Sequence, residues 1–152
     1  MLAIFVVRPG KSVATDSSML RRFGIKPPPA PVLVVDDDEE TRDAVACLLE
    51  SAGYRVLTAV YGHHALFVMD RAEQSPCVIL LDLMMPVMDG VEFRAEQLND
   101  PRFRGIPVIV MSAYDDVADS VATLRTRPRV GKPVDPDRLL AAVAVACKAA
   151  AP

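Results

Sequence analysis

The sequence has no long apolar run and no surplus of positive charge, and each absence excludes a class of protein. A helix that spans a bilayer needs about 20 apolar residues in succession. The apolar start at residues 1–7 is short and has no basic leading segment. We therefore predict a soluble protein without membrane contact. The formal net charge of −3 also gives no electrostatic reason to expect direct binding of nucleic acid.

Cysteine is scarce. Cys47, Cys77 and Cys147 lie far apart in apolar surroundings and lack the spacing of metal ligands. An odd number of cysteines argues against a disulfide framework. We predict buried, reduced thiols, which suit the reducing conditions of the cytoplasm.

The composition changes near residue 30. Residues 10–18 are small and polar, and residues 26–31 are rich in proline. We predict an extension or proline-rich linker over residues 1–30, for which disorder and a short strand at residues 2–7 are the alternatives. About half of the chain is apolar, which is enough for one folded domain over residues 31–152.

From residue 31 onward, short β-branched runs alternate with segments of helical periodicity. Gly53 is placed to end the first helix, and Asp135 is placed to cap the last one. The pattern predicts five strands and five helices, and hence a parallel sheet covered on both faces. The expected strands are 32–35, 54–59, 77–81, 107–111 and a short one before Lys132, and the expected helices include 65–71, 90–98 and 115–124.

Polar side chains follow the predicted strands at the edge where ligands gather in such sheets. Asp36 and Asp37 follow the first strand, Asp82 the third, Ser112 the fourth and Lys132 the fifth. Carboxylates held close together repel one another and recruit a cation. Magnesium prefers oxygen ligands and keeps positions free for a phosphate. The pattern predicts a magnesium site at which Asp82 meets a phosphoryl group that Ser112 and Lys132 contact.

Each acidic segment also has a simpler interpretation. Residues 36–40 could be an acidic helix start that the helix dipole favours, and Asp82 could be a helix cap. The joint placement of aspartates, a serine and a lysine on separate strand ends favours the site.

Four segments resemble the receiver domain of two-component response regulators, of the kind found in CheY-like proteins. They are Val34-Val-Asp-Asp37, Leu81-Asp-Leu-Met-Met-Pro-Val-Met-Asp-Gly90, Val110-Met-Ser-Ala113 and Lys132-Pro133. The resemblance covers about residues 31–149. It implies a flavodoxin-like (βα)5 fold, in which a central parallel five-stranded sheet lies between two helical layers.

The resemblance also implies roles for individual residues. Asp82 would be the phospho-acceptor and would bind Mg²⁺ together with Asp37 and the backbone carbonyl of Met84, while Asp36 would support the metal through water. Ser112 would be the switch hydroxyl, and Lys132 would contact the phosphoryl group. A cis peptide bond before Pro133 is expected. Asp38 is predicted to be a solvated neighbour of the site rather than a ligand.

The sequence departs from the family pattern before Lys132. Arg129 stands where the family usually has an aromatic residue, and a guanidinium does not replace a rotating aromatic ring in kind. Transmission of a phosphorylation signal through this region is therefore expected to differ or to be weak. By the resemblance, Met84 and Tyr114 stand at the two positions that line the path of an attacking water in the family. Both are large here, and we expect slow self-dephosphorylation.

These observations support one function over two others. The first is a single-domain, cytoplasmic response regulator that accepts phosphate from a histidine kinase or phosphotransfer protein. Since no output domain follows in this sequence, it would act on a downstream protein target, and its only catalysis would be its own phosphorylation and dephosphorylation. The second is a receiver-like interaction module that switches without phosphorylation. The third, a phosphatase with an aspartyl-phosphate intermediate, is disfavoured because Asp82-Leu83-Met84 lacks a second aspartate.

Overall fold

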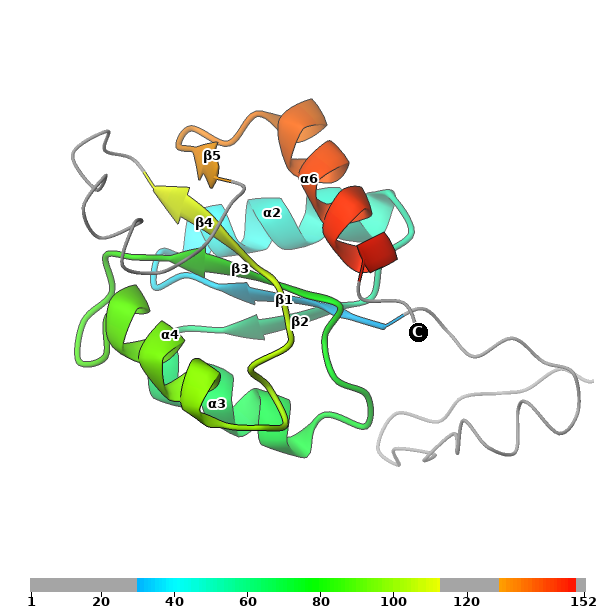
Figure 1. Ribbon diagram of the computed structural model, residues 1–152. Helices are drawn as coiled ribbons and strands as arrows, with labels where there is room; N and C mark the ends of the chain where they lie inside the picture. The colour runs from blue at the N-terminus through cyan, green and yellow to red at the C-terminus, as the bar shows by residue number, and fades with distance from the viewer. Residues whose placement is uncertain (1–29, 113–128, 150–152) are drawn as a thin grey trace, which may run out of the picture.

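The computed structural model describes residues 30–112 and 129–149, and these residues form a parallel sheet between two layers of helices (Figure 1). The sheet has five strands in the order β2-β1-β3-β4-β5, and every neighbouring pair is parallel. The predicted α/β fold of the flavodoxin-like type is confirmed. The elements are β1 (Val32–Val35), α2 (Glu39–Ser51), β2 (Val56–Ala59), α3 (Gly62–Arg71), β3 (Val78–Asp82), α4 (Gly90–Asn99), β4 (Val108–Ser112), β5 (Arg129–Gly131) and α6 (Pro136–Ala149).

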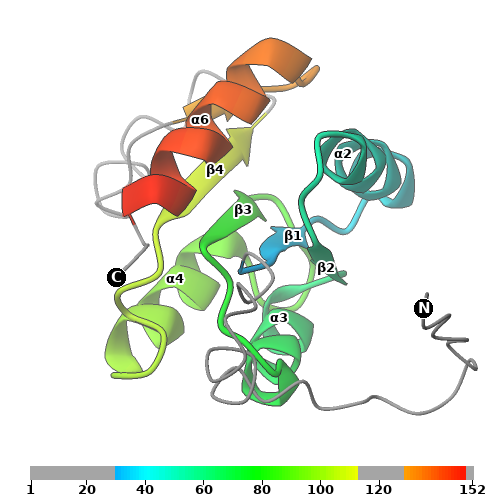
Figure 2. The same cartoon turned by 90° about the vertical axis from the view of Figure 1, so that its right-hand side faces the viewer.

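The central strands β1 and β3 are buried along their whole length. Their continuous apolar runs are typical of strands that are covered on both faces. On one face they pack with α3 and α4 around Phe93, and on the other with α2 and α6 around Leu49 and Leu139. Figure 2 shows these two helical layers on opposite sides of the sheet.

Local signals in the sequence set the ends of several helices. The Asp38 side chain accepts a hydrogen bond from the backbone N–H of Thr41 and caps α2. Gly53 has a φ of 91°, a backbone conformation that favours glycine, and it lies just beyond the end of α2. The Asp135 side chain accepts from the backbone N–H of Arg138 at the start of α6. The predicted roles of Gly53 and Asp135 are confirmed.

The observed elements differ from the expected ones mainly at their ends. The helix expected at 65–71 begins earlier, at Gly62, which lies against the side chain of Met88. Only residues 129–131 of the weak stretch before Lys132 form a strand. The expected helix at 115–124, the alternative strand at 2–7 and nearly all of the extension lie outside the described residues. Within residues 30–112 and 129–149, no helix has the length and apolar character needed to span a membrane.

The cysteines contradict the prediction of three buried, reduced thiols. Cys77 and Cys147 form a disulfide with a Cα–Cα distance of 4.8 Å, and Cys47 is an exposed free cysteine. The two bonded residues are 70 positions apart in the sequence. The strand-helix alternation brings them together because the start of β3 and the end of α6 lie at the same edge of the sheet.

Candidate functional site

Three carboxylates meet at the carboxyl ends of β1 and β3. Val35 of β1 is paired with Leu81 of β3 in the parallel register, so Asp36 and Asp82 follow at the same level of two adjacent strands. Asp37 lies beside them, and one oxygen of each of the three carboxylates lies within 4.8 Å of the other two. Asp36 and Asp82 are buried, whereas Asp37 is exposed. The structure therefore brings together the three acidic residues that the sequence predicts for a metal site.

Hydrogen bonds hold Asp36 in one orientation. Its Oδ1 accepts from the backbone N–H of Asp38 at 3.0 Å, and its Oδ2 accepts from Nζ of Lys132 at 2.7 Å. Its backbone carbonyl accepts from Nη1 of Arg42 at 3.0 Å. Because both of its carboxylate oxygens already have protein partners, Asp36 is better suited to hold a metal-bound water than to bind a metal directly.

Asp82 is 5% exposed at the end of a strand that is otherwise completely buried. Burial, together with the neighbouring charges of Asp36 and Asp37, raises its pKa to about 6, although Lys132 opposes this shift. Its Oδ1 accepts a hydrogen bond of 3.3 Å from the backbone N–H of Met84. Asp82 is therefore ionised at neutral pH, but without a bound cation its charge lowers the stability of the folded state.

Lys132 is the cation that forms ion pairs with the carboxylates of the cluster in the described structure. It follows β5, and its peptide bond to Pro133 is cis, as the resemblance implied. Nζ lies 2.7 Å from Oδ2 of Asp36 and 3.6 Å from Oδ1 of Asp82. Burial alone would lower the pKa of Lys132, but its hydrogen bond to Asp36 and the charges of both aspartates raise it, so the lysine is charged.

The loop between β3 and α4 forms one lip of the site. Asp89 and Glu92 form a capping box that begins α4, a feature that their spacing in the sequence could have indicated. Gly90 is required because a Cβ atom there would lie 2.6 Å from the carbonyl oxygen of Asp82. Val87, which is 88% exposed, has a φ of 69°, a conformation that is unusual for a β-branched residue. The sequence did not indicate this strained position.

The structure places the remaining predicted residues to different extents. Ser112 is the last residue of β4, and its backbone is paired with Gly131 of β5, but its side chain lies outside the described part of the structure, as does Tyr114. Arg129 begins β5 with its side chain exposed. The Met84 side chain is 67% exposed at the lip of the site, and the role of its carbonyl as a metal ligand stays a prediction.

The donor set fits a small divalent cation. Three carboxylates and one ammonium group leave the ionised cluster with a net charge of −2. Carboxylate oxygens are the ligands that Mg²⁺ prefers in proteins, and Mg²⁺ usually keeps several waters as well. In the described structure, Asp37 and Asp82 each have at least one carboxylate oxygen that accepts no hydrogen bond from the protein and could bind a metal. Asp36 instead accepts a hydrogen bond from Lys132.

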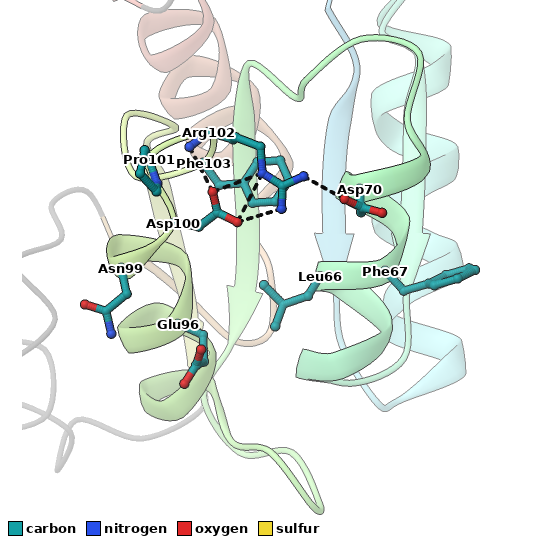
Figure 3. A pocket seen from close by; sticks show the side chains of 9 residues that line it. All are labelled: Leu66, Phe67, Asp70, Glu96, Asn99, Asp100, Pro101, Arg102 and Phe103. Carbon is teal, nitrogen blue, oxygen red and sulfur yellow. Dashed lines mark hydrogen bonds and ion pairs between the residues drawn. The ribbon is translucent and has the colours of Figure 1, made fainter.

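A hollow of about 600 Å³ elsewhere in the fold is separate from the acidic cluster. It lies between α3 and α4, and Figure 3 shows Arg102 joining Asp70 to Asp100 across it. Both distances from the guanidinium nitrogens to the carboxylate oxygens are 2.7 Å. The carboxyl ends of helices in such a fold lie at the opposite edge of the sheet from the carboxyl ends of the strands. The hollow is therefore not part of the site around Asp82.

Comparisons with known proteins agree with this geometry. The family model of the response regulator receiver domain matches residues 32–144. An uncharacterized 14.6 kDa protein of Leptolyngbya boryana is 36% identical over 123 residues, which make up 80% of this chain and 92% of that protein. The transcriptional regulatory protein GlrR of Escherichia coli is 36% identical over 127 residues, 82% of this chain but only 28% of GlrR.

A solved structure resembles the fold closely. The chemotaxis protein CheY4 of Vibrio cholerae superposes with a TM-score of 0.70 at 29% identity, covering 77% of this chain and 98% of CheY4. The family model covers well over half of the chain, and it includes all three aspartates and Lys132. The chain therefore belongs to the response regulator receiver family of two-component signalling.

Proposed function

We propose that this protein is a single-domain response regulator that accepts a phosphoryl group on Asp82 in a Mg²⁺-dependent reaction. The observation that carries the proposal is the position of Asp82. One of its carboxylate oxygens lies within 4.8 Å of those of Asp36 and Asp37, close enough to bind the same metal ion, and Nζ of Lys132 lies 3.6 Å from its Oδ1. Single-domain action is supported by the match to 92% of a 14.6 kDa relative, although the same domain forms 28% of GlrR. Its phosphodonor would be a histidine kinase or a phosphotransfer protein, its output would pass to a protein target, and its location would be the cytoplasm.

The residues of the chain divide the chemistry among them. An oxygen of Asp82 attacks phosphorus, and the bond between phosphorus and the donor nitrogen breaks as the new P–O bond forms. Lys132, with its Nζ 3.6 Å from Asp82, donates hydrogen bonds to the phosphoryl oxygens, where negative charge is spread in the transition state. Ser112 would contact another of these oxygens. Mg²⁺, held by Asp37, Asp82 and the carbonyl of Met84 and supported through water by Asp36, would neutralise the charge of the approaching phosphoryl group.

Phosphate incorporation from acetyl phosphate, followed by intact mass, tests this proposal. We expect the wild type to gain one phosphoryl group only when Mg²⁺ is present, and Asp82→Asn to gain none. Asp43→Asn provides a matched control, because Asp43 is an exposed aspartate on α2 and is not one of the three carboxylates of the cluster. Labelling of Asp82→Asn at the wild-type rate would refute the assignment of the acceptor.

A second function has a specific observation in its favour. Arg129 takes the place of the usual aromatic residue and is exposed at the start of β5, so a phosphorylation signal would not be transmitted by a rotating ring. In this alternative the domain binds its partner without phosphorylation. A folded wild type that takes up no phosphate from acetyl phosphate with Mg²⁺ would favour it.

We also predict slow loss of phosphate from Asp82. The Met84 side chain stands at the lip of the site and is 67% exposed, where it would hinder a water that approaches in line with the P–O bond. Phosphorylated protein should decay over minutes or longer in a phosphate-release assay, and Met84→Ala should decay faster. A wild-type lifetime of only seconds would contradict this prediction.

A further inference from the structure

Two cysteines meet at the edge of the sheet opposite the acidic site. Cys77 immediately precedes β3, and Cys147 lies in the last turns of α6. Their Cα atoms are 4.8 Å apart, which lies within the range of about 4.4–6.8 Å that disulfides require. Both belong to the apolar core between α6 and the sheet, where Cys77 is 7% exposed and Cys147 is half-buried.

The surroundings of Cys77 also suit the reduced pair. Sγ of Cys77 lies 3.5 Å from the carbonyl oxygen of Ala30. A disulfide sulfur has no hydrogen to donate, so this contact becomes a hydrogen bond only when Cys77 carries a thiol. In the disulfide form Cys147 is the partner of Cys77, and in the reduced form the Ala30 carbonyl would accept a hydrogen bond from the Cys77 thiol, so that neither form would leave Cys77 without a partner in the core.

We propose that Cys77 and Cys147 are a reversible oxidation site, at which a peroxide converts a dithiol into a disulfide that fastens α6 to β3. The partial exposure of Cys147 gives a small oxidant or a reducing thiol access to one sulfur of the pair. This proposal goes beyond the proposed phosphoryl chemistry and does not depend on it.

The chemistry balances with a peroxide as the oxidant. The Cys147 thiolate attacks one peroxide oxygen, so that an S–O bond forms, the O–O bond breaks and the released oxygen leaves as water after protonation. The Cys77 thiolate then attacks the sulfenic sulfur of Cys147, and the S–S bond forms as hydroxide leaves and is protonated to a second water. The two thiols lose two electrons and the peroxide gains them. A dithiol reductant reverses the step by attacking the sulfur of Cys147.

The bond acts on α6 and not on the acidic cluster. Cys77 is five residues before Asp82, which is about 16 Å along an extended strand. The disulfide therefore joins the far end of β3 to the last turns of α6, whose inner face packs through Val143 and Ala146. Oxidation is expected to hold this end of α6 in place, and reduction to let it open more often, while the environment of Asp82 stays the same.

The experiment uses the full chain carrying Cys47→Ser, so that only the proposed pair can react. After reduction and treatment with hydrogen peroxide, intact mass should show a monomer that has lost two hydrogens, and thiol titration should fall from two to none. Dithiothreitol should restore both thiols. The oxidised form should melt on the order of 10 °C higher than the reduced form, because the bond closes a long loop. Amide exchange over residues 143–149 should also be slower in the oxidised form.

Matched variants separate this site from the phosphoryl site. Cys77→Ser and Cys147→Ala, each made in the same background, should show no change in melting or in exchange after peroxide, and either one suffices if the other fails to fold. Labelling of Asp82 by acetyl phosphate should be equal in the oxidised and reduced forms. Two thiols that stay free after peroxide treatment would overturn the proposal, as would a disulfide that leaves exchange in α6 unchanged.

Discussion

Replacing Asp82 by asparagine should stabilise the protein when no divalent metal is present. Burial and the charges of Asp36 and Asp37 raise the pKa of Asp82 to about 6 from its ordinary 3.8. The folded state therefore binds this proton more tightly than the unfolded state, and stability falls as pH rises from about 4 to 6. Above about pH 6 the folded protein carries the full loss of stability that comes from the ionised Asp82. Asparagine keeps the shape of the side chain and removes its charge.

The size of the effect follows from the shift. A pKa that is raised by about two units corresponds to about 3 kcal/mol at pH 8, and solvent screening at the open mouth of the site reduces this to about 2 kcal/mol. At pH 4.5 the remaining difference between Asp82→Asn and the wild type should be below about 1 kcal/mol, since most of the folded protein is then protonated at Asp82.

Urea denaturation followed by circular dichroism, with EDTA present, measures this difference at both pH values. Asp43→Asn, at an exposed position on α2, controls for a general loss of negative charge and should change stability little. Mg²⁺ at pH 8 should stabilise the wild type more than Asp82→Asn, because binding to the folded state adds to its stability. An Asp82→Asn variant that is no more stable than the wild type at pH 8, or that gains equally at both pH values, would refute the reasoning.

Three further substitutions test the neighbourhood of the site. Lys132→Ala should lower the free energy of unfolding by about 3 kcal/mol at pH 7 in urea titration, because it leaves the fully buried Asp36 carboxylate without its ion pair; an unchanged midpoint would contradict the pairing. Val87→Gly should raise the stability by about 1 kcal/mol, since glycine accepts a φ of 69° and the valine side chain is exposed; a lower melting temperature would show that the valine is not strained. Gly90→Ala should lower the free energy of unfolding by about 2–3 kcal/mol and weaken Mg²⁺ binding, because its Cβ would press on the carbonyl of Asp82. An unchanged Mg²⁺ affinity in calorimetry would contradict this prediction.

The acidic cluster could be predicted from the sequence because its aspartates stand at the carboxyl ends of predicted strands. Asp36 directly follows β1 and Asp82 is the last residue of β3, and a parallel topology places such strand ends at one edge. The pairing of Lys132 with Asp36 at 2.7 Å could not be predicted, since it depends on how a long side chain crosses the ends of the intervening strands. The raised pKa of Asp82 depends likewise on burial that only the packed sheet creates.

Other features escaped prediction for different reasons. Val87 has a backbone conformation that β-branched residues usually avoid, so its residue type pointed away from the observed φ. Cys77 and Cys147 are 70 residues apart, and no local pattern signals a contact at that separation. The sequence predicts the strand before Lys132 only in outline, because three residues carry too little periodicity to define its bounds.

The short strand β5 has a consequence for the order in which the site opens. Within the described residues β5 has three residues and pairs only with β4 at the edge of the sheet, whereas the aspartates follow the two interior strands β1 and β3. Backbone hydrogen bonds at an edge are broken by small local fluctuations, while those of interior strands require nearly global unfolding. Lys132 follows this edge strand, so local opening of β5 is expected to withdraw its ammonium group before the carboxylates separate. The aspartates would then lack their cationic partner and should attract a divalent cation more strongly than in the closed state.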